Sequence, residues 1–246
     1  MMIKIVDLHK RFGDQEVLRG VNLDIPEGKI TFIMGRSGTG KSVLLKHIIG
    51  LLEPDSGQIL IDGKDITTMS EKELAEIRKR FGMLFQEGAL FDSMTVGENV
   101  AFPLREHTKL SEEEIWARVR AKLAQVGLLK DIDKMPSELS GGMKKRAALA
   151  RALALDPEVV LFDEPTTGLD PIMQMSIAQL IKETKESHNL TCVVISHDIP
   201  VAFAAADKIA FLHEGVIIEE GPPEKIKESK HPFVQEFLRA LKCPSL

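Results

Sequence analysis

The segment "GRSGTGKS", Gly35 to Ser42, places glycines, a lysine and a serine at the spacing of a phosphate-binding loop. Every fixed position of the pattern G-x-x-x-x-G-K-[ST] is present. In such a loop the backbone N–H groups surround phosphates, the lysine reaches the β- and γ-phosphates, and the serine hydroxyl ligates Mg²⁺. The sequence therefore predicts a nucleoside triphosphate site, whose ligands we expect to be Gly35, Arg36, Ser37, Gly38, Thr39, Gly40, Lys41, Ser42 and Val43.

A pair of carboxylates follows the apolar run "VVLF", in "VVLFDEP". Such a run predicts a buried strand, and α/β sheets bind ligands at the carboxyl ends of their strands. We expect Asp163 to complete the Mg²⁺ shell together with Ser42, which would neutralise phosphate charge. Glu164 is then the residue predicted to polarise the water that attacks the phosphate.

Two further polar residues each end an apolar run. His197 follows "VVIS" and Gln86 follows "GMLF". The imidazole of His197 could hydrogen-bond a γ-phosphate, since either ring nitrogen can donate. The amide of Gln86 could reach Mg²⁺ or the attacking water. From spacing alone, a purely structural role for either residue is the alternative.

A second glycine motif, "LSGGM", opens a run rich in Ala, Leu, Lys and Arg. Ser140, Gly141 and Gly142 would lie at the start of a helix, where free N–H groups favour an anion. Because the first loop already holds this chain's own nucleotide, we expect the second motif to cover the phosphates bound to another copy. A two-fold dimer would then contain two composite sites at one interface. An ordinary helix start led by glycine is the alternative.

The order of the predicted elements indicates the fold. A strand ("KITFIM") runs into the glycine loop and then into an apolar helix, which begins an α/β unit. Strands alternate with helices later in the chain, and Glu214-Gly215 would turn a hairpin. We expect an α/β protein with a mostly parallel sheet flanked by helices, an antiparallel β subdomain at the N-terminus and an inserted helical subdomain.

Two helix starts carry a capping box, Ser70 with Glu73 and Ser111 with Glu114. The second opens the helical region between Gln86 and Asp156. We therefore expect one domain over residues 1–246, with a nucleotide-binding core at 1–86 and 156–246 and the helical subdomain at 87–155.

Composition excludes several classes of protein. The chain of 246 residues has a net charge of -5, which argues against a dedicated nucleic-acid binder. No apolar run approaches the ~18 residues that a membrane-spanning helix needs. The two cysteines, Cys192 in an apolar strand and Cys243 near the C-terminus, do not suggest a disulfide, which favours a reducing cytosol.

The ordered set "GRSGTGKS", Gln86, "LSGGM", "VVLFDEP", "TTGLD" and His197 resembles the ATP-binding cassette (ABC) ATPases over essentially the whole chain. The resemblance implies ATP and Mg²⁺ as cofactors, Glu164 as catalytic base and His197 as the residue that senses the γ-phosphate. It also implies that Asp170 communicates between two sites and that Phe12 stacks on adenine. Phe12 stands where a tyrosine is usual, and Met143 replaces a frequent glutamine.

A closer resemblance involves "GRSGTGKSVLLKHIIGL", "MLFQEGALFDSMTVGENVAFPLREHT" and "MPSELSGGMKKRAALARAL". These segments are similar to the ATPase subunit of MCE-associated phospholipid transporters, the branch that maintains outer-membrane lipid asymmetry. The resemblance implies a homodimer on the cytoplasmic face of the inner membrane, bound peripherally to an integral permease, with MCE-domain and accessory subunits as further partners.

Two other assignments stay open at this point. An ATPase of a small-solute importer would differ in the segment after Gln86, and "EGALFDSMTVGENVAFPL" speaks against it. A cell-division-type ABC complex also uses a single cassette on a membrane partner, so architecture does not separate it. Soluble ABC proteins of DNA repair or translation would show long coiled-coil insertions or a second cassette, and this sequence has neither.

Overall fold

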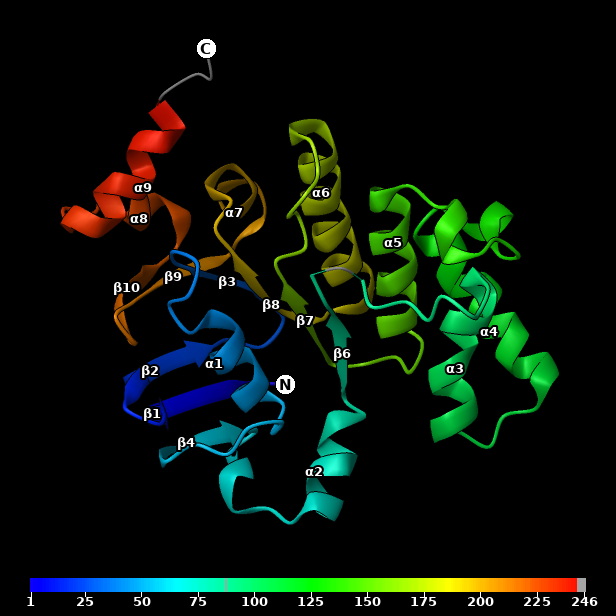
Figure 1. Ribbon diagram of the computed structural model, residues 1–246, viewed down its shortest axis with the longest axis horizontal. Coiled ribbons are helices and arrows are strands. Elements are labelled where there is room, and N and C mark those ends of the chain that lie inside the picture. The colour runs from blue at the N-terminus through cyan, green and yellow to red at the C-terminus, as the bar shows by residue number, and fades with distance from the viewer. Residues whose placement is uncertain (87, 243–246) are drawn as a thin grey trace.

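The computed structural model describes residues 1–86 and 88–242, whose strands form two sheets (Figure 1). The smaller sheet is antiparallel, in the order β2-β1-β4-β5, and contains β1 (Ile3–Phe12), β2 (Gln15–Ile25), β4 (Ser56–Ile61) and β5 (Lys64–Asp65). The larger sheet has the order β10-β9-β3-β8-β7-β6 and is parallel except for the β9–β10 pair. Its strands are β3 (Ile30–Met34), β6 (Phe81–Leu84), β7 (Val159–Asp163), β8 (Thr191–Ser196), β9 (Lys208–His213) and β10 (Val216–Gly221).

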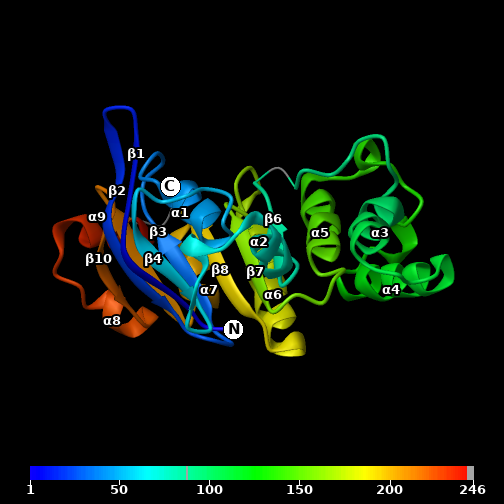
Figure 2. The same ribbon diagram turned by 90° about the horizontal axis from the view of Figure 1, so that it is seen from below.

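Helices cover and extend these sheets. Three of them, α3 (Val96–His107), α4 (Glu112–Gln125) and α5 (Gly141–Ala152), gather beyond β6 at one end of the molecule (Figures 1 and 2). At the opposite end lie α8 (Pro223–Lys227) and α9 (Pro232–Lys242). The others are α1 (Lys41–Ile48), α2 (Glu71–Arg78), α6 (Pro171–His188) and α7 (Ile199–Ala205). A helix with the length and apolar character needed to span a bilayer does not occur among the described residues.

The α/β class and the antiparallel N-terminal sheet are confirmed, and so are the local signals behind them. Both predicted capping boxes form, at the starts of α2 and α4. The β9–β10 hairpin turns at Glu214-Gly215, both with positive φ. The apolar run before Gln86 is only partly a strand, because β6 pairs with β7 from Phe81 to Leu84. Gln86 therefore lies beyond the end of the strand. Of the two cysteines, Cys192 is a buried free thiol in β8 and Cys243 lies outside the described residues.

The core explains why the polar functional residues gather at one edge. Side chains of the central strands alternate between two apolar clusters, with Phe32 and Phe162 on one face of the large sheet and Ile33 and Leu161 on the other. The first face packs on α3–α7, and the second packs on α1 and the small sheet. A parallel sheet buried on both faces leaves only the strand ends for polar chemistry.

Candidate nucleotide-binding and catalytic site

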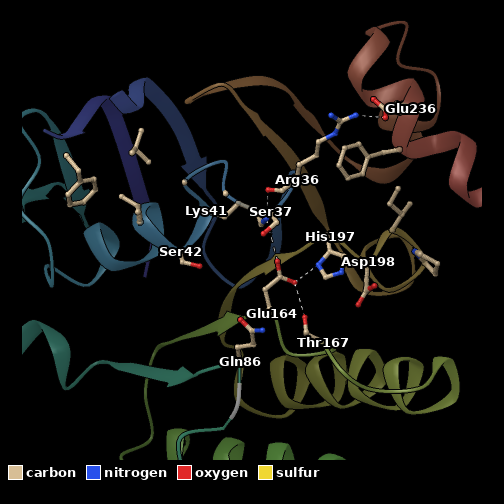
Figure 3. Close-up of a pocket in the computed structure, with 18 residues that line it drawn as sticks. Arg36, Ser37, Lys41, Ser42, Gln86, Glu164, Thr167, His197, Asp198 and Glu236 are labelled. Carbon is tan, nitrogen blue, oxygen red and sulfur yellow. Dashed lines mark hydrogen bonds and ion pairs between the residues drawn. The ribbon is translucent and has the colours of Figure 1, made fainter. Parts of the chain in front are cut away.

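A pocket of about 940 Å³ lies where β3, β7 and β8 end (Figure 3). The ends of these three strands and the segments that follow them carry the glycine loop, the two acidic residues and the histidine predicted from sequence. Eleven of the predicted site residues line it: Phe12, Arg36, Ser37, Gly38, Gly40, Lys41, Ser42, Val43, Gln86, Glu164 and His197.

The glycine loop wraps closely around its lysine. Lys41 is the first residue of α1, and its Nζ donates to the carbonyls of Gly35 at 2.9 Å and Arg36 at 3.0 Å. Glycine is required at two points. A Cβ on Gly35 would lie 2.5 Å from the Leu212 carbonyl oxygen, and Gly40 has φ 95° in the left-handed region. These two glycines let the loop backbone turn tightly into the N-terminus of α1, where free N–H groups stabilise an anion.

Ser42 and Asp163 form the oxygen pair that the sequence predicts as a metal site. The Ser42 hydroxyl donates to Asp163 Oδ1 at 3.1 Å, and Gln86 faces the same pocket (Figure 3). Burial, with the charge of Glu164 adding to it, raises the pKa of Asp163, while the Ser42 hydrogen bond opposes the shift. A hydroxyl and a carboxylate beside a phosphate loop suit Mg²⁺, which takes a few protein oxygens and completes its shell with phosphates and water. The residues present therefore fit the ion.

Glu164 is held by three neighbours. Its Oε2 lies 2.8 Å from His197 Nδ1 and accepts from the Thr167 hydroxyl at 3.4 Å, and its Oε1 lies 3.5 Å from Lys41 Nζ (Figure 3). An ionised carboxylate only accepts, so with Glu164 ionised His197 Nδ1 is the donor in this contact. The backbone of Glu164 has φ 49°, a strained conformation for a non-glycine residue that is typical of functional sites. The result is a nearly buried carboxylate aimed at the lysine of the phosphate loop.

The other predicted site residues do not line this pocket. Gly35, Thr39 and Asp163 lie beside it as part of the loop and of the Ser42 contact. Ser140 caps α5 by accepting from the Met143 N–H, and Ser140 and Gly141 are exposed. Asp170 caps α6 through the N–H groups of Ile172 and Met173. Within one chain the glycine motif of α5 is thus separate from the phosphate loop.

The pocket also contains residues that sequence reasoning missed. Asp198 and Thr167 neighbour predicted residues in sequence, so their places could have been found by extension. Glu236 and Phe237 belong to α9, far along the chain, and no sequence pattern indicates that they lie at the pocket. The full set of missed lining residues is Val17, Thr167, Asp198, Ile199, Pro200, Glu236 and Phe237.

Comparison with known proteins agrees with this geometry. The family model described as ABC transporter matches residues 18–167, more than half of the chain. The chain belongs to the ABC transporter family. Among solved structures, the dimeric post-hydrolysis state of the ATP-binding cassette MJ0796 bound to ADP and Pi matches with a TM-score of 0.81 and 35% identity, covering 90% of this chain and 98% of that one. This chain is accordingly an ABC-type ATPase, with the fold and enzyme class expected from its sequence.

Two relatives bear on what the cassette drives. The intermembrane phospholipid transport system ATP-binding protein MlaF of Haemophilus influenzae is 49% identical over 238 residues, or 97% of this chain and 90% of that protein. The probable ribonucleotide transport ATP-binding protein mkl of Mycobacterium leprae is 48% identical over 236 residues, or 96% of this chain and 68% of that protein. Each name describes the relative, and the two names differ in cargo.

Proposed function

We propose that this ABC ATPase powers a membrane transporter for phospholipid. The observation that carries the choice of cargo is the 49% identity to the H. influenzae phospholipid transport subunit along nearly its whole length. The name of the mycobacterial relative makes ribonucleotide the competing cargo. The chain works at the cytoplasmic face of the inner membrane, bound to an integral permease and to MCE-domain and accessory subunits.

The residues of the pocket divide the chemistry among them. The glycine loop and Lys41 bind the β- and γ-phosphates of ATP, and Phe12, about half exposed at the pocket, stacks on the adenine. Ser42, Asp163 and Gln86 would hold Mg²⁺, and the ion would supply positive charge that neutralises the phosphates. Glu164 orients the attacking water and accepts its proton, while His197 fixes the carboxylate and contacts the γ-phosphate.

Two copies complete the site. Ser140, Gly141 and Gly142 do not line this chain's own pocket, and Ser140 and Gly141 are exposed at the N-terminus of α5, which suits the phosphates of ATP bound to a second copy. Asp170 connects the two sites. In this scheme residues 1–86 and 156–246 are the nucleotide-binding core, and residues 87–155 are the helical part that turns toward the permease.

The assignment of the base is tested with Glu164→Gln, which keeps the shape of the side chain and removes its charge. This variant should bind ATP, dimerise and lose steady-state hydrolysis, whereas Lys41→Ala should fail to bind nucleotide. Glu224→Gln, an exposed change on α8, is the matched control. Normal turnover by Glu164→Gln would refute the role given to Glu164.

The cargo is tested with the same variant as a trap. Glu164→Gln protein purified from its native membranes with ATP and Mg²⁺ should bring with it a multi-span permease, an MCE-domain protein and bound phospholipid. Recovery of a bound ribonucleotide other than ATP or ADP, of a solute-binding protein or of a division complex would overturn the phospholipid assignment. A soluble dimer without a membrane partner would overturn the transporter itself.

A further inference from the structure

A buried lysine lies on the helix that begins with the second glycine motif. Lys145 is five residues beyond Ser140 in α5, and only 6% of its surface is exposed. Its Nζ donates to the Thr167 carbonyl at 2.8 Å, which is its single hydrogen bond in the described part of the chain. A buried ammonium with one neutral acceptor is costly. Burial accordingly lowers the pKa of Lys145, although Asp198 and Glu164 raise it.

The acceptor of this bond belongs to the turn that carries the catalytic carboxylate. Thr167 N–H donates to the Glu164 carbonyl at 3.3 Å, and the Thr167 hydroxyl donates to Glu164 Oε2 at 3.4 Å. The neighbouring Thr166 hydroxyl donates to the Asp198 carboxylate, beside His197. Lys145 thus links α5 to the Thr167 peptide. Thr167 in turn contacts the Glu164 side chain (Figure 3), whose own backbone is strained.

We infer that Lys145 is a positioning residue for ATP hydrolysis, and that its ammonium fixes the Thr167 peptide so that the Glu164 carboxylate stays aimed into the nucleotide pocket. Lys145 does not line that pocket, so it acts through Thr167 and not on the nucleotide. The inference rests on the proposed role of Glu164. Since Ser140 begins the same helix, a displacement of α5 by the partner's nucleotide would reach Glu164 through this bond.

The test compares variants that differ only in the donor. Lys145→Met keeps the length and volume of the side chain and removes the ammonium, while Lys145→Arg restores a charged donor. Lys144→Met is the control, since Lys144 is the adjacent lysine of α5 and is only half buried. ATP hydrolysis is measured on the full chain in the complex purified through it, alongside nucleotide binding and the melting temperature.

Lys145→Met should lower kcat by roughly tenfold to a hundredfold, the scale of a misplaced catalytic group. The KM for ATP and nucleotide binding should stay within about twofold of wild type, because the phosphate loop is untouched. Lys145→Arg should recover most of kcat. In the Glu164→Gln background, Lys145→Met should cause no additional loss of the residual rate, since both changes remove one function.

Several outcomes would overturn the inference. These are a kcat for Lys145→Met within twofold of Lys144→Met, a raised KM with normal kcat, or an additive loss in the double variant. Failure of the proposed function looks different, because Glu164→Gln would then hydrolyse ATP normally. A general packing role for Lys145 would lower the melting temperature of Lys145→Met and leave its kcat, measured below that temperature, unchanged.

Discussion

The close contact between β6 and α5 depends on a glycine, Gly82, and this dependence permits a specific prediction. A Cβ added to Gly82 in β6 would lie 2.4 Å from the carbonyl oxygen of Ala152 and 3.1 Å from its carbonyl carbon. Ala152 is the last residue of α5. Gly82→Ala therefore has to separate the strand that leads to Gln86 from the helix that Ser140 caps.

The expected cost follows from what blocks the methyl group. Overpacking a well-packed interior costs about 1–3 kcal/mol. At Gly82 the obstacle is backbone, and the strand is pinned in parallel register with Val160 of β7, so no side chain can rotate away. We expect roughly 3 kcal/mol, and at ~2–4 °C per kcal/mol for a chain of this size the melting temperature should fall by about 6–12 °C.

Two other glycines of the same region are controls for stability. On Gly141 the nearest atom to an added Cβ is Leu169 Cδ2 at 3.7 Å, an ordinary contact. On Gly142 it is Met173 Cε at 2.3 Å, but this is the end of a flexible side chain. Gly141→Ala and Gly142→Ala should melt within about 2 °C of wild type. The assay is calorimetry without nucleotide, since a bound ligand would raise every melting temperature. A Gly82→Ala protein that melts with the controls would refute the reasoning.

Three further predictions concern other parts of the molecule. The hydrogen bonds of Arg80 hold the pKa of Glu158 below its ordinary value of 4.5, so their stabilisation is present at neutral pH and is lost as the pH falls through the lowered pKa. Arg80→Met should cost up to about 1 kcal/mol in urea unfolding at pH 7, because the pair is half exposed, and a cost unchanged in acid would contradict this origin. Asn99 is fully buried; its side-chain oxygen accepts from Phe91 N–H, and its side-chain nitrogen donates to the carbonyls of Phe91, Met94 and Thr95. Asn99→Ala should therefore cost about 3 kcal/mol of stability and expose residues 88–95 to protease. Equal cleavage of the variant and the wild type would contradict this prediction. The Glu236 carboxylate pairs with Arg36 at the pocket, and both are more than half exposed, so Glu236→Gln should leave stability unchanged and tighten ATP binding by roughly twofold to fivefold at low salt, with Glu224→Gln as control. An equal effect at high salt would show that charge is not the cause.

The sequence by itself determined the features that depend on neighbouring residues. The glycine loop needs only its own backbone and the start of the next helix, so "GRSGTGKS" predicted the phosphate site. Capping boxes and the hairpin turn at Glu214-Gly215 are likewise formed within a few residues. Apolar runs that end in polar residues predicted which strand ends would carry Asp163, Glu164 and His197.

Only the tertiary structure decided which of these ends meet, because that depends on strand order and packing. The Ser42–Asp163 contact joins residues 121 apart, and it exists because β3 and β7 lie on either side of β8. The approach of Glu236 to the pocket depends on the packing of α9, where Phe237 lies against Phe211 of β9. The hydrogen bond from Lys145 to the Thr167 carbonyl likewise depends on tertiary packing. In the sequence this lysine stands in the charged run "KKR", where nothing distinguishes it from its neighbours, and it is buried because α5 packs against the turn after β7.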